Sequence, residues 1–430
     1  MAPIYTFPAQ PVAPFGCGRF RSPDPTLLEG FAVYGPMVWT RDALEVSWPR
    51  VHAFRLRRHH LSRPANRRDL ATVAGDVCGV QAQILSAGRL ALRARTRGLR
   101  PDDVERALVR DRTLVAAWCM RGTRHFLPSK EFAVFSRGCH HIAGRWTSWF
   151  VRHKWPVDRI ESIVESMARA MGRPRTRGEV LDLVSEDLGL RKQAKRMSRG
   201  WGNVAHTEGL EVGRRVLSMS GMMGFASIRG LACCGPGDGN ETTFVRPDAW
   251  IPGFRDVPIP VAERGLVRRY LRGYGPSTPE DFSVWAAFPL RGARAIWTEI
   301  GEELAEVRVG GSRAWVLRED LPALRTATIA GPVVRLLPYF DSYLLGHKDR
   351  SHLIDAKHYR RVFRPAAWIA PAVLVDGRVA GTWSQTPRRG TVEVRVEAFA
   401  RHGRGIKEGI EAEAEDLARF LERPVRVAYA

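Results

Sequence analysis

Two glutamines that flank a single alanine, Gln81 and Gln83, are the side chains of this sequence with the clearest chemical potential. They lie in the otherwise apolar stretch Gly79-Val-Gln-Ala-Gln-Ile-Leu-Ser-Ala-Gly88. An amide accepts hydrogen bonds at its oxygen and donates them from its NH2 group, so it can hold a water molecule and contact a phosphate or sugar oxygen. Residues i and i+2 diverge on a helix but point the same way on an extended segment. Because glycines stand at both ends of the stretch, we expect a break between two helices in which the amides converge.

A neutral amide pair restricts the reaction that it could catalyse. Hydrolysis of an ordinary glycoside needs a proton donor and a carboxylate. A purine alkylated at N7 already carries a positive charge, so it can leave without an added proton. The enzyme then has to position a water molecule and stabilise an oxocarbenium-like state, which neutral amides can do. The alternative is that Gln81 and Gln83 satisfy backbone groups at a helix end.

Other catalytic signatures are absent from the sequence. It contains no GxxxxGK[ST], HExxH or GxSxG motif, no convincing dinucleotide fingerprint and no CxxC pair. Two adjacent histidine pairs, His59-His60 and His140-His141, would diverge on helices and rarely share a metal. We therefore expect neither a metal nor another cofactor.

The charge of the chain points to a polyanionic partner. Lys and Arg total 67 against 45 Asp and Glu, which leaves a net charge of +22. Duplex DNA is the expected partner, and an anionic membrane surface is the weaker reading. No apolar run approaches the ~20 residues that span a bilayer, so we expect no membrane segment.

Two basic runs are candidate phosphate-contacting surfaces. Between Val51 and Arg68 there are six arginines and no acid, although a solvated surface is always possible for such a run. Residues 191–199 form the second run. The candidate DNA-binding residues in these runs are Arg55, Arg57, Arg58, Lys192, Lys195 and Arg196.

Patterning along the chain predicts an α+β protein built from a repeated unit. Helices are expected at residues 66–80 and 84–97 and from Pro101, followed by a hairpin, which is the winged-helix order of three helices and a β-hairpin. The order recurs twice, with the second hairpin expected from strands at 224–229 and 241–245 and the third from Leu304–Val309 and Arg313–Leu317. The predicted division is a disordered Pro-rich tail, three winged-helix units and a C-terminal β-rich domain, at residues 1–44, 45–157, 158–260, 261–331 and 332–430. Met37 is a candidate alternative start within the tail.

Four stretches in a fixed order resemble the AlkZ/YcaQ-like (AlkX-type) family of winged-helix DNA glycosylases over about residues 45–430. They are Gly79-Val-Gln-Ala-Gln83, Met120-Arg-Gly-Thr-Arg-His125, Leu337-Pro-Tyr-Phe-Asp-Ser-Tyr-Leu-Leu-Gly-His-Lys-Asp-Arg350 and Val373-Leu-Val-Asp-Gly-Arg-Val-Ala-Gly-Thr-Trp383.

The resemblance implies three tandem winged helices and a C-terminal β-domain around a concave, basic DNA-binding channel. It also implies removal of bulky N7-alkylated purines and unhooking of interstrand crosslinks, with self-resistance to a DNA-alkylating natural product in some members. Gln81 and Gln83 carry over as the catalytic pair.

Further residues carry over more loosely from the same resemblance. Arg121, Thr123 and His125 follow the first wing and are candidate DNA contacts, or else they pack the wing hairpin. Lys348 and Arg350, with Asp341 and Tyr343, are candidates for the channel lining. A buried Asp–Arg brace is the alternative for this group. The loop at 235–240 is placed like a hairpin tip that could enter a groove, or it is an idle turn.

The expected function is therefore that of a monofunctional DNA glycosylase acting on double-stranded DNA with alkylated purines. We expect it to be a monomer in the cytoplasm, associated with the nucleoid. The alternative is a non-catalytic winged-helix DNA-binding protein, either a transcriptional regulator or a shield over lesions. The amide pair separates the two hypotheses, because a regulator would not need it.

Overall fold

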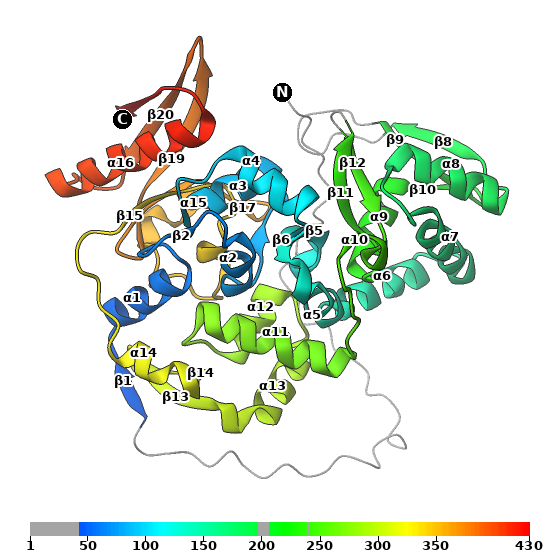
Figure 1. The fold of residues 1–430 in the computed structure, drawn as a ribbon. Helices are drawn as coiled ribbons and strands as arrows, with labels where there is room; N and C mark the ends of the chain where they lie inside the picture. Colours follow the sequence, from blue (N-terminus) through cyan, green and yellow to red (C-terminus); the bar gives the residue numbers. More distant parts are fainter. Residues whose placement is uncertain (1–42, 197–205, 239–240) are drawn as a thin grey trace.

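The computed structural model describes residues 43–196, 206–238 and 241–430, so the predicted tail lies almost wholly outside it. Within these residues the chain is a mixed α/β protein in which no sheet closes into a barrel. Figure 1 shows the first segment at the centre, the second at the right, the third at the bottom and the C-terminal hairpin with helix α16 at the upper left. Leu44, the last residue of the predicted tail, already belongs to a strand.

The first segment alternates short strands with helices. Helix α2 ends at Asp76, earlier than predicted, because Gly79 has a φ of +91° and the next residues are extended. The break expected between the two helices is therefore confirmed. The elements are β1 (Leu44–Val46), α1 (Trp48–Arg58), β2 (Ala65–Asn66), α2 (Leu70–Asp76), β3 (Val80–Gln81), α3 (Leu85–Arg93), β4 (Thr96–Arg97), α4 (Pro101–Glu105), β5 (Leu114–Trp118), β6 (Arg124–Pro128), α5 (Phe132–Gly138) and α6 (His140–Arg152).

The second segment corrects one predicted strand. Residues 224–229 lie in helix α9, whose N-cap Ser218 accepts a hydrogen bond from the backbone N–H of Gly221. This short apolar run is buried on all sides and so lacks the alternation that separates a strand from a buried helix. Of the predicted loop at 235–240, residues 235–238 belong to strand β11, and residues 239–240 lie outside the described chain. The elements are α7 (Val157–Ala170), β7 (Arg175–Thr176), α8 (Arg177–Leu188), β8 (Lys192–Arg196), β9 (His206–Val212), β10 (Arg215–Ser218), α9 (Met219–Ile228), β11 (Cys233–Asp238) and β12 (Glu241–Val245).

The third segment contains its predicted hairpin, and it also binds strand β1 of the first segment. Strand β1 pairs in parallel with β13, from Leu44↔Val307 to Val46↔Val309. The apolar face of α1 packs in the same small core as this hairpin. By its packing, helix α1 thus belongs to the third segment. The sequence predicted that it would belong to the first. The elements are α10 (Pro247–Trp250), α11 (Ile259–Tyr274), α12 (Pro279–Ala286), α13 (Leu290–Glu299), β13 (Leu304–Val309), β14 (Ser312–Leu317) and α14 (Leu321–Arg325).

The C-terminal segment is a sheet of order β15-β18-β19-β20-β21 with helix α16 packed against it. Asp376 and Gly377 form the turn between β18 and β19, with positive φ at both residues. The elements are β15 (Val334–Leu337), a 3-10 turn (Ser342–Leu345), α15 (Tyr359–Val362), β16 (Phe363–Arg364), β17 (Trp368–Ile369), β18 (Ala372–Val375), β19 (Arg378–Arg388), β20 (Thr391–Ala398), α16 (Arg404–Leu421) and β21 (Val425–Tyr429).

One register recurs in the first three segments. In each segment, a residue shortly after one helix (α2, α7 or α11) pairs with the second strand of the hairpin. The pairs are Gln81 with His125, Thr176 with Thr243, and Ser277 with Trp315. The hairpins of the first two segments also join, through Ala116↔Cys234, in one sheet of order β3-β6-β5-β11-β12-β7. Strand β3, which carries Gln81, is therefore an edge strand.

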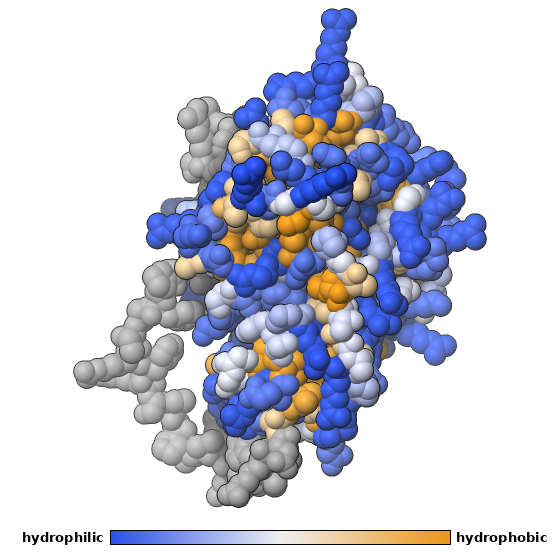
Figure 2. Space-filling model, turned by 90° about the vertical axis from the view of Figure 1, so that its left-hand side faces the viewer, coloured by the Kyte–Doolittle hydropathy of each residue, from blue (hydrophilic) through white to orange (hydrophobic). Residues whose placement is uncertain are grey.

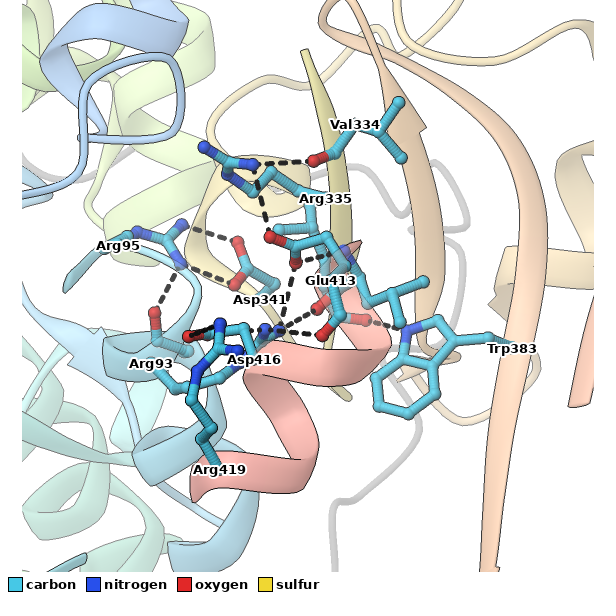
Figure 3. Close-up of polar contacts among 12 residues, drawn as sticks. Arg93, Arg95, Val334, Arg335, Asp341, Trp383, Glu413, Asp416 and Arg419 are labelled. Atoms are coloured by element: carbon cyan, nitrogen blue, oxygen red, sulfur yellow. Dashed lines mark hydrogen bonds and ion pairs between the residues drawn. The ribbon is translucent and has the colours of Figure 1, made fainter. Parts of the chain in front are cut away.

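Arginines at the end of α3 hold the C-terminal segment against the first one (Figure 3). Both guanidinium NH2 groups of Arg95 donate to Asp341, at 2.8 and 2.7 Å, and neither side chain is exposed. Arg93 pairs with Glu413 and Asp416 of α16, at 3.2 Å each. An ion pair taken out of water is stable only when its geometry is good and its remaining hydrogen bonds are made, as they are for Asp341.

Removing the carboxylate of this pair should destabilise the protein strongly. Asp341→Ala leaves the Arg95 charge buried without a partner, which costs about 3–5 kcal/mol. The midpoint of urea unfolding measures the loss. Asp355→Ala is the matched control, because its pair with Arg378 is exposed and should contribute about 0–1 kcal/mol. Equal losses in the two variants would show that the buried pair does not hold the segments together.

Candidate active site around Gln81 and Gln83

The backbone of the glutamine motif is extended and held on both edges. On one edge β3 pairs with β6, and the Ala82 N–H donates to the Arg124 carbonyl at 2.7 Å. On the other, the Ser342 hydroxyl donates to the Gly79 carbonyl at 3.1 Å and accepts from the Gln81 N–H at 3.3 Å. A single side chain thus replaces a neighbouring strand at this edge.

Small residues allow this close packing. A Cβ on Gly79 would lie 2.8 Å from the Met120 side chain, and its φ of +91° also favours glycine. A Cβ on Gly88 of α3 would lie 2.7 Å from the Cβ of Ala82, which is fully buried. Because side chains alternate along an extended segment, Gln81 and Gln83 leave the chain on the side opposite Ala82.

The orientation of both amides is fixed by donors. Gln81, which is only 6% exposed, accepts at Oε1 from Nη2 of Arg121 at 2.7 Å. Gln83 is half-buried and accepts at Oε1 from the backbone N–H of Arg124 at 3.0 Å. Neither partner has a lone pair to offer, so each amide must turn its oxygen toward it. Within the described residues, the two NH2 groups make no hydrogen bond, and each oxygen keeps a second lone pair.

The neighbouring histidine has no free proton to give, because its one N–H is bonded to a backbone carbonyl. Nδ1 of His125 lies 2.9 Å from the Thr123 carbonyl, which can only accept, so Nδ1 carries the hydrogen. Nε2 then accepts from Arg121, at 3.2 Å. Burial first, and then the positive charge of Arg121, lowers the pKa of His125 to about 3. The ring is neutral at physiological pH.

The structure brings part of the predicted site together. Arg121 contacts Gln81 by a hydrogen bond, and His125 contacts it by strand pairing. Thr123 instead donates its hydroxyl to the Met120 carbonyl. Wing packing describes His125, which is 1% exposed, while Thr123 is partly exposed and stays a candidate DNA contact. Sequence reasoning missed Ser342, although it lies inside the long motif ending at Arg350. It also missed Trp285, whose backbone carbonyl contacts Arg121 and leaves no sequence signal.

The first basic run divides between the interior and the surface. Arg55 is 3% exposed and donates to the carbonyls of Gly275 and Pro276, so its prediction as a DNA contact is wrong. This arginine ties α1 to the third segment instead. Arg58 forms an ion pair with Asp320, whereas Arg57 is exposed and stays a candidate.

The other predicted contacts lie on β8 and at the end of the long motif that ends at Arg350. Lys192 is exposed on β8 and pairs with Asp182 at 2.7 Å. Lys195 and Arg196 lie on the same strand, with side chains outside the described part. Lys348 is exposed, and Arg350 donates to the Tyr359 hydroxyl at 3.1 Å.

Asp341 forms the buried brace proposed as the alternative to channel lining, with Arg95 as its partner. Tyr343, 3% exposed, donates its hydroxyl to the Gly377 carbonyl. These two residues therefore support the fold and do not line a channel.

His59 and His60 have separate surroundings at the end of α1, but the rings of His140 and His141 lie edge to face with their centroids 6.3 Å apart, so this second pair does not diverge as expected. His59 is buried between the rings of Tyr274 and Tyr343, and His60 bonds Asp76. His141 contacts the Ala286 carbonyl. The described residues contain no group of three His, Cys, Asp or Glu side chains that could hold a metal ion. No helix among them has the length and apolar character needed to cross a membrane.

Comparison with known proteins assigns the chain to a class. Residues 74–420 match the family described as DNA glycosylase AlkZ-like. The chain therefore belongs to the DNA glycosylase AlkZ-like family.

A sequence comparison and a structure comparison, both with Streptomyces sahachiroi, support this. An interstrand DNA cross-link repair glycosylase is 31% identical over 397 residues, which cover 89% of this chain and 100% of the relative. The solved structure of the DNA glycosylase AlkZ superposes with a TM-score of 0.73 at 28% identity, over 90% of this chain and 100% of that one.

The buried histidines should make the folded protein less stable as the pH is lowered. Burial lowers the pKa from 6.5 to about 4 for His52, about 3 for His125, about 4 for His141 and about 2 for His352. Below pH ~6.5 the unfolded chain therefore binds protons that the folded chain does not. Stability that is complete above that pH is lost as pH falls, by up to about 1.4 kcal/mol per pH unit for each histidine.

The midpoint of urea unfolding, measured at pH 7.5, 6 and 5, tests this expectation. It should decrease steadily across the series. An unchanged midpoint would mean that the folded protein takes up protons as readily as the unfolded chain.

Proposed function

We propose that this protein is a monofunctional DNA glycosylase that hydrolyses the N-glycosidic bond of bulky N7-alkylated purines, and that it unhooks interstrand crosslinks. The observation that carries the proposal is a pair of oriented neutral amides beside a histidine that cannot donate a proton. Such a site suits a leaving group that is already cationic. The printed name of the curated relative, a cross-link repair glycosylase, agrees with this substrate class.

The mechanism follows from the hydrogen-bonding groups that the two amides leave unused within the described chain. These are their NH2 groups and one lone pair on each oxygen. A water molecule can donate to the remaining lone pair of an amide oxygen and accept from an NH2 group. Held in this way, it attacks the anomeric carbon as the C1′–N9 bond breaks and its electron pair passes to the base, which leaves neutral. The proton that the attacking water loses passes to bulk solvent. The amide oxygens and the DNA phosphates stabilise the positive charge that develops on the sugar.

Each of the first three segments is proposed to be a winged-helix unit. The support is their shared order of helix, pairing residue, further helices and hairpin, together with the shared register. With the C-terminal sheet they would enclose a concave, basic channel for duplex DNA. The face at the left of Figure 1 carries hydrophilic side chains around separate apolar patches, consistent with a charged, solvated surface (Figure 2).

DNA contacts are proposed at the exposed basic residues Arg57, Lys192 and Lys348, and at Arg350. A monomer acting in the cytoplasm is the simplest assembly for a clamp around one lesion. Self-resistance to a DNA-alkylating natural product would be the biological role. The non-catalytic alternative, a winged-helix regulator or lesion shield, gives no reason for two oriented amides.

Loss of both amides should abolish catalysis and spare DNA binding. Gln81→Ala combined with Gln83→Ala removes the groups that hold the water, so base release should slow by at least about 10²–10³-fold. The assay is alkali-induced strand scission of a duplex with one nitrogen-mustard N7-guanine adduct, with affinity measured in parallel. Gln385→Ala, in an exposed part of β19, is the control. A double variant that releases the base at the normal rate would leave only the non-catalytic alternative.

The charge of the adduct should decide which bases are released. A neutral O6-alkylguanine in the same duplex needs a proton to leave, and the site has no donor for it. We expect release from the N7 adduct and none above background from the O6 adduct under identical single-turnover conditions. Comparable rates on the two duplexes would require a general acid and would refute the mechanism.

A further inference from the structure

Arg121 contacts the candidate catalytic pair and the third segment at the same time. Its Nη2 donates to Gln81 Oε1 at 2.7 Å, and its Nη1 donates to the Trp285 carbonyl of α12 at 2.5 Å. The guanidinium lies 5.6 Å from the centroid of the Trp285 ring. The Arg121 backbone has a φ of 58°, a left-handed conformation that few residues other than glycine adopt. Strain of this kind is kept where the surrounding structure over-determines it.

We propose that Arg121 is the positioning residue of Gln81 and that helix α12 holds Arg121 in place. The inference rests on the proposed function, because it requires Gln81 to be catalytic. It changes the role expected from the sequence, which was either a DNA contact or packing of the wing hairpin.

The geometry of the guanidinium supports a positioning role. Nη1 and Nη2 are directed at three acceptors: the Trp285 carbonyl, Gln81 Oε1 and His125 Nε2. A planar fork can satisfy such an arrangement, whereas a lysine ammonium is a point charge on a flexible stem. The charge-assisted bond to Oε1 fixes which end of the Gln81 amide faces Arg121, so the NH2 group points away from the guanidinium.

Electrostatics alone predicts the opposite effect of removing Arg121. A positive charge near a sugar that becomes cationic disfavours the transition state. If Arg121 acted only through its charge on that sugar, its removal would speed base release. If it positions Gln81, its removal slows base release, because a displaced catalytic group costs up to about 10²-fold. The sign of the change separates the two roles.

Arg112 offers a matched control elsewhere in the first segment. It too has a left-handed backbone, with a φ of 50°. It donates to the carbonyl of Trp250 at 3.4 Å, and its guanidinium lies 4.0 Å from the centroid of that ring. Neither glutamine is among its partners. Arg112→Met therefore removes one positive charge and one Arg–Trp contact without touching Gln81.

The experiment compares Arg121→Met with Arg112→Met on the duplex carrying the nitrogen-mustard N7-guanine adduct. Single-turnover rates report catalysis, and the dissociation constant reports DNA binding. We expect Arg121→Met to slow base release about 10–10²-fold while its dissociation constant matches that of Arg112→Met. Arg121→Lys should stay slow, since charge without the fork cannot orient the amide. Base release by Arg121→Met at the rate of Arg112→Met, or faster, overturns the inference.

A double-mutant cycle with Gln81→Ala completes the test. If Arg121 acts through Gln81, adding Arg121→Met to Gln81→Ala should cause no further loss of rate. Independent, multiplying losses would overturn the positioning role. Should Arg121→Met fail to fold, Arg121→Lys takes its place in the same cycle.

The cycle also separates this inference from the proposed function. A normal rate for Gln81→Ala refutes catalysis by the pair, whatever Arg121 does. A slow Gln81→Ala beside a normal Arg121→Met refutes only the inference about Arg121.

Discussion

The buried ion pair between Arg95 and Asp341 is the contact on which the candidate site depends. Its bidentate geometry holds the 3-10 turn that begins at Ser342 against the first segment. Ser342 in turn bonds both the Gly79 carbonyl and the Gln81 N–H. An edge strand with unpaired backbone groups tends to fray or pair wrongly, and this hydroxyl prevents it locally. The long aspartate- and tyrosine-containing motif and the glutamine motif, far apart in sequence, are therefore parts of one structure.

The repeated units show what is special about the glutamine motif. In the second and third segments, Thr176 and Thr278 cap the next helix through a capping box with Glu179 and Asp281. In the first segment, α3 follows Ile84 and has no side-chain cap. The first segment thus lacks an N-cap side chain, which typically stabilises a protein by ~1 kcal/mol, next to its two glutamines. A local rule broken at one copy of a repeat is a common mark of a functional site.

The sequence was informative wherever local chemistry decides the structure. The break at Gly79 and the third hairpin, formed by β13 and β14, both follow from glycines and strand patterning. The sequence was misleading where tertiary packing decides. Residues 224–229 form a buried helix, since a short apolar run fits either element.

The same limit applies to the site. The two glutamines were identifiable because an amide pair in an apolar stretch needs an explanation. Arg55 was misassigned because a basic run does not reveal which arginine turns inward to bond backbone carbonyls. The support from Trp285 was invisible for a similar reason, because any residue can supply a carbonyl.

The parallel pairing of β1 with β13 has a consequence for how the chain is made. The partner of Leu44 is Val307, which the ribosome adds about 260 residues later. Protein synthesis adds about 5–20 residues per second. Strand β1 and the apolar face of α1 therefore stay uncovered for roughly 13–50 s after they are made. During that interval this part of the nascent chain exposes a strand edge and an amphipathic helix, a natural substrate for a holding chaperone.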